Sequence, residues 1–159
     1  MNIIKHSYKW ASGLKAHSTI TRIVLHCAAT PEGRDYSVEQ IHKAHLARKF
    51  SGIGYHYVIY RDGTIHEGRP SWATGAHASG YNSTSIGICY VGGMDAENKH
   101  AKDTRTPAQK EALLQLVHEL MAKYKIPLSR VIGHYMVAAK ACPSFKMDVF
   151  RKEYQARYK

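Results

Sequence analysis

The chain of 159 residues is 44% hydrophobic and 22% charged and shows no low-complexity tract or repeat, which excludes disordered and repeat architectures and fits one globular domain. Lys and Arg outnumber Asp and Glu by 23 to 12, so the net charge is +11. This charge favours an anionic target such as nucleic acid, an anionic membrane or an acidic cell-wall polymer. The basic residues are scattered and form no zinc-knuckle, RNA-binding aromatic or basic-helix pattern, so we do not expect nucleic acid as the partner.

The N-terminus lacks both the apolar core and the small-residue cleavage site of a secretory signal. No apolar run approaches the roughly 18 residues of a membrane span. Cys27, Cys89 and Cys142 are an odd number of cysteines and too few for a disulfide scaffold, which agrees with a reducing compartment. We expect a monomer that is synthesised in the cytoplasm without a signal peptide and reaches any target outside the cell after lysis or by specialised export.

The first elements in chain order are a lead-in, a strand and a helix. Residues 1–20 are polar and mixed, and we expect them to precede a single domain over residues 21–159. The apolar run 23–25 predicts a buried strand that delivers His26 at its C-terminal end. A capping box over residues 37–40 predicts a helix of about three turns that follows it.

The middle of the chain predicts a hairpin and a loop. Runs 55–60 and 64–67 flank an Asp-Gly turn, which is typical of a hairpin. Strand alternation places Tyr55 on one face of this hairpin and His56 on the other. Residues 75–82 hold two glycines and an asparagine without apolar periodicity, which indicates a loop.

The C-terminal half predicts two further strands and two helices. Residues 86–91 read as a central strand and residues 131–132 as a short one. Residues 106–109 open a helix with a threonine cap, a proline at the first position and a glutamine at the third. A last helix is expected over residues 145–154. Strands interleaved with helices, together with a local hairpin, predict an α/β fold in which a central mixed β-sheet is flanked by helices.

Three side chains carry the ligand types of a zinc site. His26 and His134 each follow a short apolar strand, and Cys142 lies eight residues beyond His134 and precedes a proline. Zinc binds neutral imidazole and thiolate, and a catalytic site commonly combines three protein ligands with one open position. Most of the 11 histidines must be structural or surface residues, so the position at strand ends singles these two out. Cys27 and Cys89 lie in or beside apolar strands, where a thiol acts as a small hydrophobe.

Several motifs occur in the order known from one family. They lie in residues 24–30, 54–64, 80–93, 106–109 and 134–145. On these motifs the chain resembles the zinc-dependent N-acetylmuramoyl-L-alanine amidases of type 2, a group that includes phage amidase-lysozymes and peptidoglycan recognition proteins. The resemblance spans residues 22 to about 150. It implies hydrolysis of the amide bond between N-acetylmuramic acid and L-alanine of the stem peptide, with peptidoglycan as the partner and cell-wall lysis as the role.

The resemblance also assigns the catalytic machinery. It implies one Zn2+ ion bound by His26, His134 and Cys142, with Tyr55 as the catalytic tyrosine and Lys140 as the catalytic lysine. In this assignment Lys140 stabilises the oxyanion of the tetrahedral intermediate, and Tyr55 hydrogen-bonds the attacking water or the oxyanion.

Four further residues are candidates for contact with substrate. His77, Tyr81 and Asn82 match a region that borders the substrate cleft in the family, although Asn82 also suits a turn. His56 lies beside Tyr55 and either supports a ligand or packs in the interior.

Two alternatives stay open at this point. The first is a non-catalytic peptidoglycan-binding module, which usually lacks a zinc ligand, particularly the cysteine; Cys142 is present here. The second is a lytic enzyme with an added regulatory role, in which it binds a polymerase or another partner. The chain also departs from its phage relatives in one place, where Tyr135 and Met136 follow His134.

Overall fold

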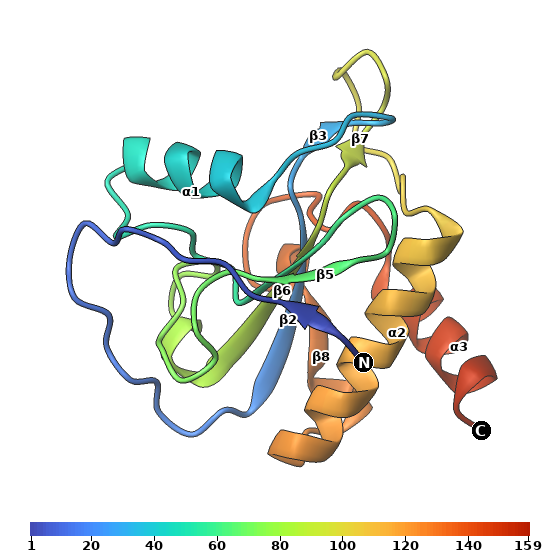
Figure 1. Cartoon of the computed structure of the whole chain (residues 1–159). Helices are drawn as coiled ribbons and strands as arrows, with labels where there is room; N and C mark the ends of the chain where they lie inside the picture. The colour runs from blue at the N-terminus through green and yellow to red at the C-terminus, as the bar shows by residue number, and fades with distance from the viewer.

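A computed structural model describes residues 1–159 and shows a mixed six-stranded sheet with helices on both faces (Figure 1). The strand order is β1-β5-β4-β6-β2-β8. The pairs β4·β6, β6·β2 and β2·β8 are parallel, whereas β5 is antiparallel to β4. The bounds are β1 Ile3–Ile4, β2 Arg22–Cys27, β4 Tyr57–Ile59, β5 Ile65–Glu67, β6 Ser85–Tyr90 and β8 Val131–Gly133. This arrangement confirms the predicted fold class.

The two longest strands of the sheet, β2 and β6, align residue for residue from Arg22 opposite Ser85 to Cys27 opposite Tyr90. Every residue of β6 is buried, as expected for a strand covered on both faces. Alternation along β2 sends Ile23 and Leu25 into the larger core, while Val24 and His26 point to the opposite face. His26 therefore stands on one defined side of the sheet, at the C-terminal end of its strand.

The helices divide between the two faces of the sheet. The larger core contains side chains of α2 (Pro107–Tyr124) and α3 (Met147–Arg157), which lie side by side in Figure 1. The opposite face is covered by α1 (Val38–Ala47), whose Val38 and Ile41 pack on Val58 and Cys89. Short 3-10 turns at Asn82–Thr84, Leu128–Arg130 and His134–Met136 connect the remaining segments.

The predicted helix starts are confirmed by their hydrogen bonds. Ser37 caps α1 and Thr106 caps α2, and in both boxes the hydroxyl accepts from the third backbone N–H while the glutamine side chain accepts from the capping residue. Gln109 of the second box has a further role, because its buried amide donates to the carbonyl oxygens of Ile59 and Val91. The box thus fastens α2 to β4 and to the residue that follows β6.

The predicted hairpin forms, but its strands are shorter than expected and one face assignment is wrong. Strand alternation predicts that Tyr55, Tyr57 and Ile59 share one face. In the structure Tyr57 and Ile59 enter the larger core, whereas Tyr55 packs with the smaller cluster around Val58. The reason is local, since β4 begins only at Tyr57 and the preceding residues are not regular strand. Period-two alternation therefore does not extend back to Tyr55, which lies on the same side of the sheet as His26.

Three short strands were not anticipated. Within the lead-in, β1 pairs in parallel with β5 at the edge of the sheet. Just after β6, β7 (Gly93–Met94) pairs with β3 (Thr30–Pro31) to form a separate two-stranded sheet. None of the helices combines the length and apolar character that a membrane crossing requires.

Candidate metal centre and active site

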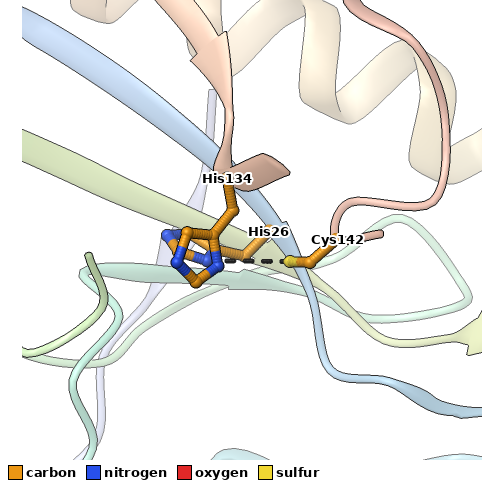
Figure 2. A group of neighbouring side chains, drawn as sticks. All are labelled: His26, His134 and Cys142. Atoms are coloured by element: carbon orange, nitrogen blue, oxygen red, sulfur yellow. Dashed lines mark hydrogen bonds between the residues drawn. The ribbon is translucent and has the colours of Figure 1, made fainter. Parts of the chain in front are cut away.

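Three side chains from different elements converge at the C-terminal edge of the sheet. His26 lies at the C-terminal end of β2, His134 follows β8 directly, and Cys142 lies in the loop before α3. Figure 2 shows the three side chains pointing toward one another. Their candidate ligand atoms all lie within 4.8 Å of one another, and Cys142 Sγ is 3.8 Å from His26 Nδ1. Parallel neighbouring strands bring their carboxyl ends to one edge, which is why residues over 100 positions apart meet here.

The loop that carries Cys142 is held in place by hydrogen bonds to the sheet. The Tyr135 N–H donates to the Cys142 carbonyl at 2.8 Å, and the Tyr90 hydroxyl donates to the Pro143 carbonyl at 2.7 Å. The Cys27 N–H donates to Cys142 Sγ at 3.2 Å. A donor aimed at the sulfur suits a thiolate, because a thiolate is the stronger acceptor.

The protonation states of the two imidazoles fit a metal site. Burial first, and then His77 and His134, lower the pKa of His26 well below 6.5. Burial and the nearby Lys140 ammonium lower the pKa of His134. Both rings are therefore neutral near pH 7, which is the state that binds a cation.

The thiol completes a donor set that fits zinc. The Cys27 side chain and burial raise the pKa of the Cys142 thiol, so a thiolate here requires a neighbouring cation. Two atoms bound to one zinc ion at a tetrahedral angle lie about 3.6 Å apart, from Zn–N and Zn–S bonds of roughly 2.1 and 2.3 Å. The separation of 3.8 Å between Cys142 Sγ and His26 Nδ1 is close to that spacing. The three residues are thus positioned to hold a metal ion.

A cleft of about 580 Å³ opens over this centre. His134 and Cys142 line it together with Tyr55 and Lys140, so the structure brings the two predicted catalytic side chains to the same cavity as two ligands. The Tyr55 ring lies 5.0 Å from the His26 ring, measured between centroids. Burial, aided by the nearby thiols, raises the pKa of Tyr55 well above 10, so its hydroxyl stays protonated and is a hydrogen-bond donor.

The position of Tyr55 is fixed by the residue before it. Gly54 donates its N–H to His45 Nδ1 at 2.9 Å, and a Cβ at Gly54 would lie 2.0 Å from the Ala76 carbonyl oxygen. Only glycine allows this close approach. The His45 ring packs 5.3 Å from the Tyr55 ring, and burial together with Arg48 and Arg69 lowers the pKa of His45 to about 4.

The four residues predicted to contact substrate occupy different positions. His77 and Asn82 line the cleft. Tyr81 is not among the residues that line the cleft, and Arg22 lies over its ring. His56 is fully buried, and its ring bonds the Gly87 N–H and the Ala73 carbonyl. Their contact with substrate stays a prediction.

Sequence reasoning missed part of the cleft wall. His45, Arg48 and Phe50 line the cleft from the end of α1 and the turn after it. No motif marked them, because their place depends on how α1 crosses the sheet. Tyr135 and Met136, which follow His134, point away from the centre: the Tyr135 hydroxyl accepts from the Met147 N–H, and Met136 is 47% exposed.

Comparison with known proteins decides the family. A family model described as N-acetylmuramoyl-L-alanine amidase matches residues 16–145. The chain belongs to this amidase family. The endolysin of Enterobacteria phage T3 is 42% identical to this amidase over 133 residues, which cover 84% of the amidase and 86% of the endolysin. A peptidoglycan-recognition protein of Drosophila melanogaster is 32% identical over 132 residues, 79% of this chain and 69% of that protein.

A solved structure of similar shape is the N-acetylmuramoyl-L-alanine amidase LysC from Clostridium intestinale URNW. It superposes on this amidase with a TM-score of 0.83 and 31% sequence identity, covering 98% of each chain. The amidase is therefore an enzyme of the N-acetylmuramoyl-L-alanine amidase class, a peptidoglycan hydrolase, and the cleft over the three converging side chains is its candidate active site.

Proposed function

We propose that this amidase is zinc-dependent and hydrolyses the amide bond between the lactyl group of N-acetylmuramic acid and L-alanine of the stem peptide. The observation that carries the proposal is the convergence of two neutral imidazoles and a thiol within 4.8 Å, two of them lining a cleft, in a chain of this family. The ligands would be His26, His134 and Cys142. A zinc ion held there would supply Lewis acidity, which acidifies water and polarises an amide carbonyl.

The side chains around the centre suit the remaining steps of amide hydrolysis. The hydroxyl of Tyr55 is protonated and donates a hydrogen bond to the attacking water or to the carbonyl oxygen. The Lys140 ammonium, at the mouth of the same cleft, stabilises the negative charge that develops on that oxygen. Water adds a hydroxyl to the lactyl carbonyl carbon, the C–N bond breaks, and the alanine nitrogen leaves with the second proton of the water.

The substrate we propose is the muramoyl peptide of peptidoglycan, and the place of action is the cell wall, reached after lysis or by export. The basic surface of the protein supports this, since a net charge of +11 attracts acidic wall polymers. The presence of Cys142 beside the two histidines favours catalysis over binding alone. We further propose that the enzyme acts as a monomer.

The experiment is digestion of purified peptidoglycan with zinc-loaded and with chelated protein, followed by mass analysis of the products. We expect free stem peptides beginning with L-alanine and intact glycan strands from the zinc-loaded protein, and no release from the chelated protein. Reducing sugar ends without released stems would refute the proposed bond specificity. Undiminished release by the chelated protein would refute the zinc requirement.

A matched pair of histidine variants controls this experiment. His134→Ala removes a proposed ligand and should abolish release. His118→Ala on the exposed face of α2 removes a hydrogen bond to Tyr154 and a ring stack on Tyr158, both outside the cleft, and should retain release.

A further inference from the structure

A line of hydrogen bonds runs from His26 through His77 to Ser85 and the Tyr81 carbonyl. His26 Nε2 lies 2.8 Å from His77 Nδ1, His77 Nε2 lies 3.3 Å from Ser85 Oγ, and Ser85 Oγ lies 2.7 Å from the Tyr81 carbonyl oxygen. His77 is 9% exposed, and His26 and Ser85 are fully or almost fully buried. Both ring nitrogens of His77 are therefore engaged by buried partners.

The direction of each hydrogen bond follows from its last member. A carbonyl oxygen only accepts, so the Ser85 hydroxyl must donate its single hydrogen to the Tyr81 carbonyl oxygen. Ser85 Oγ can then only accept from His77, which places a hydrogen on His77 Nε2. A buried imidazole with neutral partners carries one hydrogen, so His77 Nδ1 is bare and accepts from His26 Nε2.

This hydrogen-bond direction determines the tautomer of His26, a proposed ligand. With its hydrogen on Nε2, His26 has its free lone pair on Nδ1, which is the atom that faces Cys142 Sγ at 3.8 Å. The other tautomer of His26 would leave His77 Nδ1 facing a second bare nitrogen. The line thus permits only the form of His26 that binds a cation at the centre.

Close packing against two glycines and hydrogen bonds of its loop hold the His77 ring in place. A Cβ at Gly75 would lie 2.6 Å from the ring and a Cβ at Gly87 would lie 2.7 Å from it, so two glycines make the slot that the ring fills. The Asn82 side-chain oxygen accepts from the N–H groups of His77 and Ala78 at 2.8 and 2.9 Å, which fixes the loop.

We infer that His77 is a positioning residue, which holds His26 in the Nε2–H tautomer and presents Nδ1 to the metal. This inference rests on the proposed zinc site and deepens it. It gives His77 a function through His26, in addition to its place on the cleft wall. Partners that orient a metal-binding histidine commonly alter metal affinity by about 10- to 100-fold when removed.

The test is a pair of substitutions that have nearly the same shape. His77→Asn places its Oδ1 where Nδ1 of the imidazole lies and so keeps an acceptor for His26. His77→Leu has a similar shape but no acceptor atom. The dissociation constant for Zn2+ is measured by competition with a chromophoric chelator, and circular dichroism of the metal-free protein checks the fold. We expect His77→Leu to bind Zn2+ about 10- to 100-fold more weakly than the unmodified protein. His77→Asn should stay within about threefold. Equal affinity in His77→Leu, or an equal loss in both variants, would overturn the inference.

A second measurement needs no variant and no metal. Two-dimensional proton–nitrogen spectra of the histidine rings distinguish the two tautomers in the metal-free protein. We expect His26 as the Nε2–H form, and an Nδ1–H form would overturn the inference even where His77→Leu fails to fold. Failure of the proposed function has a different signature, because the unmodified protein would then bind no Zn2+ whatever the tautomer of His26.

Discussion

At the residue scale, the three proposed ligands differ in how firmly the protein holds them. His26 is 2% exposed and bonded on its far side to His77, whereas His134 and Cys142 are partly exposed on the cleft. The buried histidine therefore forms a fixed wall, and the other two ligands border the space that substrate would enter. A metal held by these three residues would keep a coordination position free on the cleft side, as catalytic zinc sites do.

Tyr55→Phe and Lys140→Ala test the proposed roles of the two catalytic side chains. Each removes a donor for the developing negative charge while leaving the ligands untouched, so we expect turnover to fall by about 100-fold with zinc content unchanged. Peptide release from peptidoglycan and metal analysis of the purified variants measure the two effects. Tyr158→Phe and Lys152→Ala near the C-terminus are matched controls. Unchanged turnover in both cleft variants would disprove these roles.

The sequence singled out the three converging side chains more clearly than the rest of the cleft. His26 and His134 were recognisable because each follows a short apolar strand, and Cys142 because it precedes Pro143 outside any strand. The association of Tyr55 with them rested on family resemblance, since the strand pattern placed it without reference to His26. The contacts of His77 with His26 and Ser85 were not predictable, because they depend on how a glycine-rich loop folds over β2 and β6.

At the element scale, the regular parts of the fold carried strong local signals. Both capping boxes, the Asp-Gly hairpin and the strands β2, β6 and β8 formed where the pattern predicted them. The strands β1, β3 and β7 are two residues long and form only by pairing with distant segments, so no local pattern could reveal them.

A buried ion cluster ties the segment between β7 and α2 to α3. This cluster predicts a stability that depends on pH. The Arg105 side chain is fully buried and bonds both Asp103 and Glu153. Burial opposes ionisation of Asp103, but the hydrogen bonds and charge of Arg105 outweigh it and lower the pKa of Asp103 below 3.8. A carboxyl group whose pKa is lower in the folded state stabilises the fold above its unfolded pKa, and this stabilisation is lost as the pH falls through the folded value.

Asp103→Asn should therefore lower the free energy of unfolding by about 2 kcal/mol at pH 7, with a smaller difference near pH 3. Urea unfolding of both proteins at the two pH values measures this. Asp35→Asn is the control, because Asp35 is 87% exposed in its pair with Arg61 and surface pairs contribute little. A difference that is absent at pH 7, or the same at both pH values, would show that the cluster does not act this way.

At the scale of the whole molecule, the two faces of the sheet have separate tasks. The face under α2 and α3, which lie together in Figure 1, buries most of the apolar core. The opposite face, under α1 and the loop of residues 75–82, holds His26, His77, Tyr55 and the cleft. The interleaving of strands and helices predicted the layers. It did not predict the strand order, in which β2 lies between β6 and β8 and so brings His26 beside His134.

The most direct test of a zinc centre in this amidase is X-ray diffraction from its crystals at the zinc absorption edge, after loading with one equivalent of Zn2+. We predict a single anomalous peak bound by His26 Nδ1, an imidazole nitrogen of His134 and Cys142 Sγ. An ordered cleft without a peak, or a zinc ion bound by other residues, would contradict the account.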